Sequence, residues 1–180
     1  MAPLREAFIA KLVERTAQAA IGSSALRNQG AGGVIAAARL SLASCDLQQL
    51  RRSTQGTFPD LLDQWTAVVL KSFPAKARNW GAARKAMNLY LRDVAYNVDL
   101  SEAFALSQIR SLLEVPLDKD VASGLLCEQE GTSLPKWPTI KRLEPPTSAK
   151  YQAVAGDVAK RRGVDRVDLD VYYWRKREQA

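Results

Sequence analysis

The protein has 180 residues and carries 26 Lys and Arg against 19 Asp and Glu, a formal net charge of +7 at pH 7. It contains no histidine, which excludes every mechanism that needs an imidazole as base, proton shuttle or metal ligand. Cys45 and Cys127 are too few for an iron–sulfur cluster or a zinc site, and we expect no metal and no cofactor.

The same composition bounds the domain organisation and the location. An apolar content of 47% is enough for a buried core, and the length predicts a single domain over residues 1–180. No apolar run approaches the ~20 residues of a membrane span. Widely spaced cysteines suggest reduced thiols, with one disulfide as the alternative. We therefore expect a soluble cytoplasmic protein that makes no membrane contact.

Apolar residues spaced three and four apart predict helices in the first half of the chain. A Gly-rich turn over 28–33 separates the first two, Pro59 suits the first turn of the third, and Trp80-Gly81 breaks the chain before the fourth. The predicted helices cover residues 4–20, 34–43, 61–73 and 82–96.

The second half is also predicted to be helical around one irregular stretch. Thr147 or Ser148 is a candidate N-cap and Gly163 a candidate helix end. A Pro-rich loop is expected over 128–147. The predicted helices cover residues 101–113, 121–126 and 148–162, with a last segment over 167–177. No strand-like alternation is sustained, so the predicted fold class is all-α.

Between Asp63 and Asp93 the chain is basic and contains no acidic residue. The six cations in this window are Lys71, Lys76, Arg78, Arg84, Lys85 and Arg92. A basic helix start is a natural phosphate site, because unpaired backbone N–H groups and cations point the same way. The hairpin over 61–96 therefore has the arrangement of a helix-hairpin-helix DNA-binding element. The alternative is an ordinary αα-hairpin with a solvated basic face.

Asp118 follows Val115-Pro-Leu at a loop-to-helix junction, 33 residues after Lys85. One interpretation is that its carboxylate only caps the following helix. The other is that Lys85 and Asp118 form a reactive pair, in which the amine attacks an electrophilic carbon and the carboxylate steers protons or stabilises a developing cation.

Four segments resemble a known family when they are taken together. Gly81-Ala-Ala-Arg-Lys85 resembles the hairpin of helix-hairpin-helix DNA glycosylases, and Val115-Pro-Leu-Asp118-Lys-Asp-Val121 resembles their Val-Pro-Val-Asp signature. The Lys–Asp separation is similar to that of the archaeal 8-oxoguanine DNA glycosylase branch. Two further segments are similar to that branch's recognition and closing motifs: Ser24-Ala-Leu-Arg-Asn-Gln29-Gly30 and 154–174.

The chain also departs from the family pattern. Ala83 stands at the second hairpin glycine and Asp168 at a position that is usually histidine. The Pro-rich 128–147 stretch has no clear counterpart in the family.

The resemblance implies a helical bundle that acts as a bifunctional DNA glycosylase and AP lyase in base excision repair. The target base, with 8-oxoguanine as the first choice, is flipped out of double-stranded DNA into a pocket. Lys85 attacks the sugar as a free amine, a form that burial and the neighbouring Arg84 would favour. Asp118 would assist, and a Schiff base would lead to strand cleavage. A monomer associated with the nucleoid is expected.

Further roles follow from the resemblance. Base recognition falls to Gln29, Asp170, Trp174 and Pro116, with Asp170 and Trp174 on one helical face. Phosphate contacts fall to Lys76, Arg78, Gly81 and Arg84. The alternatives are a turn residue at Gln29 and a core tryptophan beside a surface carboxylate at 170–174. Trp65 is expected in the core, and Leu89 occupies the family's aromatic stacking position.

Two other functions compete with catalysis. A non-catalytic helix-hairpin-helix module would use Lys85 only for phosphate and would bind DNA in a salt-sensitive way. A helical protein-interaction adaptor would carry the basic hairpin as a mere surface feature.

Overall fold

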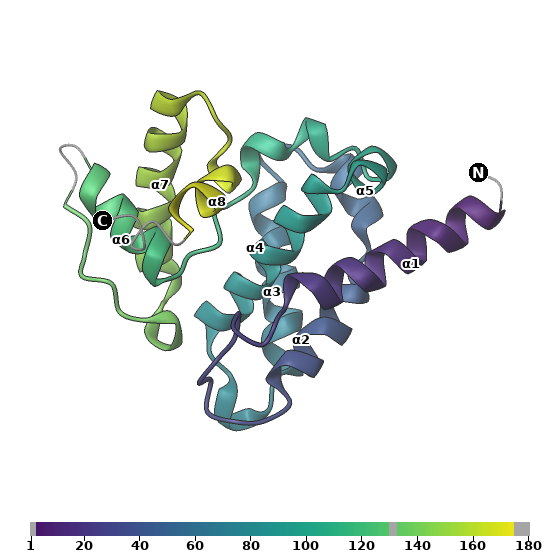
Figure 1. Ribbon diagram of the computed structural model, residues 1–180, viewed down its shortest axis with the longest axis horizontal. Coiled ribbons are helices and arrows are strands. Elements are labelled where there is room, and N and C mark those ends of the chain that lie inside the picture. The colour runs from purple at the N-terminus through teal and green to yellow at the C-terminus, as the bar shows by residue number, and fades with distance from the viewer. Residues whose placement is uncertain (1–2, 130–132, 175–180) are drawn as a thin grey trace.

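The computed structural model of the protein describes residues 3–129 and 133–174, and every regular element in these two ranges is helical (Figure 1). The prediction of an all-α fold is thus confirmed. None of the helices in these ranges is long and apolar enough to cross a membrane.

Eight α-helices and six short 3₁₀ helices follow one another in the described chain. The α-helices are α1 (Pro3–Ala20), α2 (Val34–Ala43), α3 (Phe58–Ser72), α4 (Trp80–Tyr96), α5 (Val98–Ala103), α6 (Lys119–Glu128), α7 (Pro145–Arg162) and α8 (Leu169–Tyr173). The 3₁₀ helices are η1 (Leu47–Arg52), η2 (Ala75–Ala77), η3 (Leu106–Gln108), η4 (Arg110–Leu112), η5 (Ile140–Arg142) and η6 (Arg166–Asp168).

The predicted helix over 101–113 is wrong as a continuous element. α5 ends at Ala103, and Ala105 adopts a left-handed backbone with φ 55°, which an α-helix cannot contain. Two 3₁₀ turns, η3 and η4, replace the rest of the expected helix. The periodic apolar pattern survives this change because 3₁₀ turns also place residues three apart on one side.

The predicted cap of α7, Thr147 or Ser148, is wrong by three or four residues. α7 begins at Pro145 with Glu144 as its N-cap, and it ends at Gly163 as expected. Two prolines fit this first turn because the N–H groups they lack have no partner inside the helix there. The Pro-rich stretch thus contains both η5 and the start of α7.

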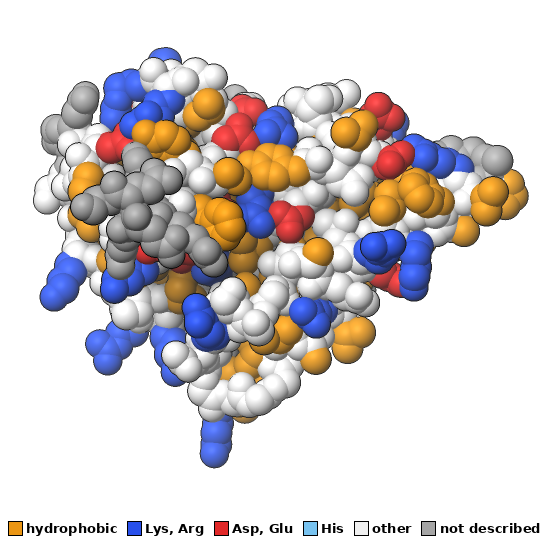
Figure 2. All heavy atoms as spheres, viewed as in Figure 1, with side chains coloured by type: hydrophobic (Ala, Val, Ile, Leu, Met, Phe, Trp, Pro, Cys, Tyr) orange, Lys and Arg blue, Asp and Glu red, His pale blue; other side chains and the backbone are white. Residues whose placement is uncertain are grey.

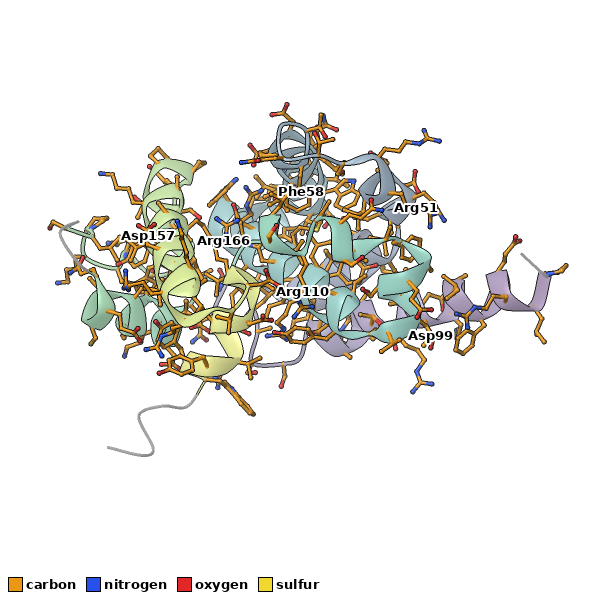
Figure 3. All side chains as sticks on the ribbon, turned by 90° about the horizontal axis from the view of Figure 1, so that it is seen from above. Arg51, Phe58, Asp99, Arg110, Asp157 and Arg166 are labelled. Atoms are coloured by element: carbon orange, nitrogen blue, oxygen red, sulfur yellow. The ribbon has the colours of Figure 1, made fainter. Side chains whose placement is uncertain are left out.

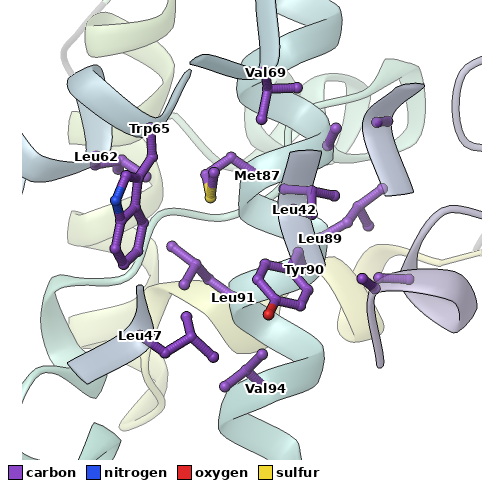
Figure 4. Packing of buried hydrophobic residues seen from close by; sticks show 14 of the residues in the cluster. Leu42, Leu47, Leu62, Trp65, Val69, Met87, Leu89, Tyr90, Leu91 and Val94 are labelled. Carbon is purple, nitrogen blue, oxygen red and sulfur yellow. The ribbon is translucent and has the colours of Figure 1, made fainter. Parts of the chain in front are cut away.

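Buried side chains form two clusters, which define two lobes. The N-terminal lobe (3–113) packs α1, α2, α3 and α5 around α4, and the C-terminal lobe (115–173) contains α6, α7 and α8 (Figure 1). α4 is buried along most of its length: Met87, Tyr90 and Val94 have no exposed surface. Figure 4 shows Trp65, Met87 and Tyr90 within this packing. A helix enclosed in this way is a rigid support for any side chain on its remaining edge.

The C-terminal lobe is held by a close fit between α6 and α8. A Cβ added to Gly124 of α6 would lie 2.3 Å from the Tyr173 ring of α8. The Tyr173 hydroxyl donates a hydrogen bond of 3.0 Å to Glu128 at the end of α6. This contact fixes the position of α8, which carries Asp170.

Two arginines join the lobes. Arg110 pairs with Asp165 at 2.9 Å and with Asp168 at 2.7 Å. Arg166 donates to the backbone carbonyls of Leu112 and Leu113 at 2.7 and 3.1 Å. Figure 3 shows both arginines where the two groups of helices meet. The polypeptide that leaves the first lobe is therefore fastened to the start of α8.

The segment 133–144 packs against the first turn of α4. A Cβ at Gly81 would lie 2.2 Å from the carbonyl oxygen of Ile140 and 2.8 Å from Cβ of Leu143. Only a glycine permits this approach of two backbones. Gly81 therefore serves contact with the chain's own η5 turn.

We expect the substitution Gly81→Ala to lower the free energy of unfolding by about 1–3 kcal/mol, because the new methyl group would overlap a backbone carbonyl. Gly156→Ala on α7 is the control: no atom lies within 4 Å of its added Cβ. That change should stabilise the protein by about 0.5–1 kcal/mol. Urea unfolding measures both, and equal effects of the two variants would contradict the described packing.

Candidate active site

Lys85 and Asp118 lie side by side. The Nζ atom of Lys85, in the second turn of α4, is 3.2 Å from Oδ2 of Asp118 at the start of α6. Their side chains are 11% and 31% exposed. The fold thus joins two residues from different lobes in a contact that is partly shielded from water and still open on one side.

Asp118 uses its two oxygens for different purposes. Oδ1 accepts the backbone N–H groups of Asp120 and Val121 at 2.9 and 3.0 Å, and therefore caps α6. Oδ2 faces Lys85. The capping interpretation and the Lys–Asp pair were posed as alternatives from the sequence, and both contacts are present at once.

A second ion pair lies beside the first. Asp170 of α8 forms an ion pair with Arg92 of α4, which also pairs with Asp93 at 2.7 Å. Arg92 is seven residues, about two helical turns, beyond Lys85 on the same edge of α4. The sequence analysis counted Arg92 among the cations between Asp63 and Asp93 but gave it no role in the site.

The electrostatics of Asp170 link the two pairs. Burial raises the pKa of the Asp170 carboxyl and the Asp118 carboxylate acts in the same direction, while Arg92 and Lys85 oppose them. The pKa of Arg92 is raised as well, because Asp170 and Asp93 together outweigh the effect of its burial. The four side chains Lys85, Asp118, Arg92 and Asp170 thus form one charged cluster.

Arg84 does not occupy the surface position expected of a phosphate contact. It is 8% exposed, and its guanidinium donates to both carboxylate oxygens of Glu114 at 2.9 and 3.2 Å and to the Thr66 hydroxyl at 2.9 Å. Asp63 lies 2.9 Å away. Two carboxylates therefore balance the charge of Arg84, which removes it as a free cation beside Lys85.

Glu114 is a residue that the sequence analysis missed. It also accepts a 2.9 Å hydrogen bond from Asn88 of α4, so two residues of α4 hold it. It comes four residues before Asp118, at the start of the segment that crosses between the lobes. Glu114 thereby fixes this segment against α4. The sequence offered one indication of this role: Glu114 stands directly before Val115-Pro116, in the segment that leads to Asp118.

The four predicted phosphate contacts fall into two groups. Lys76 and Arg78 are exposed on the hairpin, although Arg78 also donates to the carbonyl of Phe73 at 3.0 Å. Arg84 and Gly81 are buried, the first by Glu114 and the second by η5. The exposed cations of the hairpin are thus those that precede α4.

Gln29 braces the start of α4. It is 7% exposed, its Nε2 donates to the carbonyl of Arg27 at 2.8 Å, and its Oε1 accepts from Asn79 at 3.0 Å. Asn79 is the N-cap of α4 and accepts the N–H of Ala82 at 2.9 Å. The oxygen of Gln29 and at least one of its N–H groups therefore serve the protein itself.

The remaining predicted recognition residues are separated by the fold. Pro116 is buried in the segment that leads to Asp118. α8 ends at Tyr173, so Trp174 leaves the helix with ψ 123° and does not share a helical face with Asp170. Its side chain is 68% exposed. Trp65 and Leu89 are 6% and 7% exposed in the core of the N-terminal lobe, so Leu89 is no stacking surface.

Within the described residues, no group of three or more His, Cys, Asp or Glu side chains could hold a metal ion. Cys45 and Cys127 are free thiols, and burial raises the pKa of Cys45 to about 12. The charged groups that the site presents are the Lys85 amine, the Arg92 guanidinium and the carboxylates of Asp118 and Asp170.

Comparison of the chain with protein-family models, with curated proteins and with solved structures gave no match. The glycosylase resemblance accordingly stays a hypothesis, and the geometry of the charged cluster carries the functional argument.

We expect Arg84→Gln to lower the free energy of unfolding by about 3–5 kcal/mol, because it leaves the carboxylate of Glu114 without its main cation. The control is Lys71→Gln, an exposed position for which we expect a change within about 0.5 kcal/mol. Equal unfolding midpoints in urea for the two variants would contradict a structural role for Arg84.

The raised pKa of Asp170 gives a pH-dependent prediction. The folded state binds this proton more tightly than the unfolded chain, so the Asp170 contribution to stability is complete below about pH 4 and is lost as the pH rises through the raised pKa. The free energy of unfolding of the wild type should therefore fall relative to Asp170→Asn from about pH 4 upward. Urea unfolding over a pH series tests this, and a gap that moves in the opposite direction would refute it.

Proposed function

We propose that the protein is a DNA glycosylase with AP lyase activity, which uses Lys85 as the nucleophile and Asp118 as its partner. The observation that carries the proposal is the 3.2 Å contact between Lys85 Nζ and Asp118 Oδ2 across the two lobes. The position of Asp170 beside this pair, in the segment 154–174 named by the resemblance, adds support.

In the proposed reaction the free amine of Lys85 attacks C1′ of the flipped nucleotide. The bond from Lys85 nitrogen to C1′ forms as the bond from C1′ to the base breaks, and the base leaves with the electron pair and takes up a proton. Opening of the sugar ring gives a Schiff base. Loss of a proton from C2′ then expels the 3′ phosphate by β-elimination and cuts the strand.

Asp118 has two tasks in this scheme. Its Oδ2 is positioned to receive the proton that Lys85 must lose before it attacks, since donor and acceptor are within hydrogen-bond reach. Asp118 then passes this proton to the departing base, and the carboxylate restored in this way stabilises the positive charge that develops at C1′. Its other oxygen stays on α6, which keeps the group in place.

The proposed substrate is double-stranded DNA with a damaged or modified base, with 8-oxoguanine as the first choice, and the protein acts as a monomer associated with the nucleoid. The hairpin cations Lys76 and Arg78 would hold the backbone. Asp170 would accept a hydrogen bond from the base. That role requires Arg92 to share or release the carboxylate that it now holds.

The proposal competes with a non-catalytic DNA-binding module and with a protein-interaction adaptor. A lysine that only contacts phosphate is expected at the surface, as Lys76 is, and not with its side chain 11% exposed beside a carboxylate. An adaptor gives no reason for a Lys–Asp pair between lobes. The partial burial of Lys85 therefore favours the enzyme.

We expect Lys85→Gln to abolish base excision and covalent trapping by borohydride, because no amine remains to form the Schiff base. The test incubates the protein with borohydride and duplexes carrying 8-oxoguanine, uracil, alkylated bases or modified cytosines. Lys76→Gln is the matched control: the same change on the exposed hairpin should keep trapping at saturating DNA. Full trapping by Lys85→Gln would refute the assignment.

The substitution Asp118→Asn distinguishes the proposed catalytic role of Asp118 from its role as the N-cap of α6. Asparagine caps a helix about as well as aspartate, so α6 should be retained while the negative charge is lost. We expect an excision rate lower by about 10²–10⁴-fold, the usual range for a group that transfers a proton, with unfolding close to that of the wild type. An unchanged rate would leave Asp118 as a helix cap only.

A further inference from the structure

The segment 133–144 presents cations that the proposed catalytic scheme does not use. Lys136, Lys141 and Arg142 are exposed. None of the three forms an ion pair with a described residue, whereas Arg162 on α7 is held by Glu128 at 2.7 Å. Such side chains are available to an external anion.

The fold brings this segment to the hairpin. Ile140 packs on Gly81 in the first turn of α4, as described above. The Nζ atom of Lys141 lies 3.7 Å from the position of a Cβ at Gly30, and the carbonyl of Lys76 lies 3.0 Å from the same position. The loop 21–33, the hairpin and η5 therefore meet at one place.

The backbone at this place is also unusual. Thr139, directly before η5, has φ 79° and ψ 158°, a conformation that β-branched residues rarely adopt. Strain of this kind persists only where the surrounding structure enforces it. Here it turns the chain so that Ile140 reaches Gly81 while Lys141 and Arg142 face outward.

The three segments form one basic surface. Its exposed cations are Arg27, Lys76, Arg78, Lys136, Lys141 and Arg142. Glu144 is the one acidic residue within 133–150. Figure 2 shows Lys and Arg side chains along the lower edge of the molecule, where Figure 1 places the hairpin and the turn before α7. Phosphate groups of a nucleic acid are the complementary partner.

The basic surface adjoins the start of the helix that carries Lys85. Lys85 is five residues beyond Trp80, the first residue of α4, which corresponds to a rise of about 7–8 Å along the helix. A DNA backbone held at the start of α4 would therefore lie within about two helical turns of Lys85.

We propose that the segment 133–144 is a DNA-binding arm that extends the hairpin, with Lys141 and Arg142 contacting the phosphates of the duplex on the side of the C-terminal lobe. This inference rests on the proposed function for its ligand, DNA. It assigns a role to the Pro-rich stretch that has no counterpart in the family pattern, and it makes the phosphate surface a product of both lobes.

The test is the salt dependence of DNA binding by the variant Lys141→Ala/Arg142→Ala. Each phosphate contact contributes about 0.9 to the slope of log K against log salt, so the slope should decrease in magnitude by about 2. Anisotropy of a labelled, undamaged duplex gives K without any chemistry. Both residues are exposed, so the urea midpoint of unfolding should match that of the wild type.

The matched control is Lys11→Ala/Arg15→Ala, which removes the same charge from exposed positions of α1. Its slope should equal that of the wild type, because α1 is not part of the basic surface. Equal slopes for both double variants and the wild type would overturn the arm. Equal losses in both double variants would overturn it too, because the effect would then follow net charge and not position.

The failure of the arm can be told apart from the failure of the enzyme. Wild-type protein that binds duplex DNA and traps with borohydride, while Lys141→Ala/Arg142→Ala binds equally well, refutes the arm alone. Binding that depends on the arm without any trapping refutes catalysis alone. Wild-type protein that fails to bind duplex DNA even at low salt refutes both.

Discussion

The structure depends on three ion pairs along one edge of α4. Arg84, Lys85 and Arg92 each meet a carboxylate from beyond the N-terminal lobe: Glu114, Asp118 and Asp170. The other faces of this helix are enclosed by apolar side chains, so the cations have a fixed support. In the Arg84 pair, whose side chains are 9% and 15% exposed, loss of one charge leaves the other poorly solvated. Together with Arg110 and Arg166, the three pairs set where the second lobe sits on the first.

The three ion pairs differ in burial and in the part of the site that each one holds. The Arg84 pair is the most deeply buried and orders the segment that leads to Asp118, whereas the Lys85 pair is open on one side through the partly exposed Asp118. The Arg92 pair holds the carboxylate that base recognition would need. In the proposed reaction the substrate would exchange contacts with Lys85 and Asp170, while the Arg84–Glu114 pair would continue to hold the segment between the lobes against α4.

Much of the fold could be predicted from the sequence because its long helices are strongly periodic and clearly bounded. α2 covers the predicted residues, and Pro59 and Gly163 lie in the first turn and at the end of their helices as expected. The errors have local causes, such as the left-handed backbone at Ala105. The approach of Lys85 to Asp118 was anticipated from motifs. The burial of Arg84 was not, because it depends on Glu114, which is distant in sequence, and Trp174 was misplaced because α8 stops one residue earlier.

The cap of α6 has one further consequence. The carboxylate of Asp118 is planar, and two backbone N–H groups of α6 donate hydrogen bonds to its Oδ1. The orientation of the carboxylate plane therefore follows the direction in which α6 starts. These two hydrogen bonds also orient the lone pairs of Oδ2 before any ligand binds. The first turn of α6 thus restricts the orientation of the Asp118 carboxylate, whose rotational freedom is lost when the protein folds and not when a ligand binds.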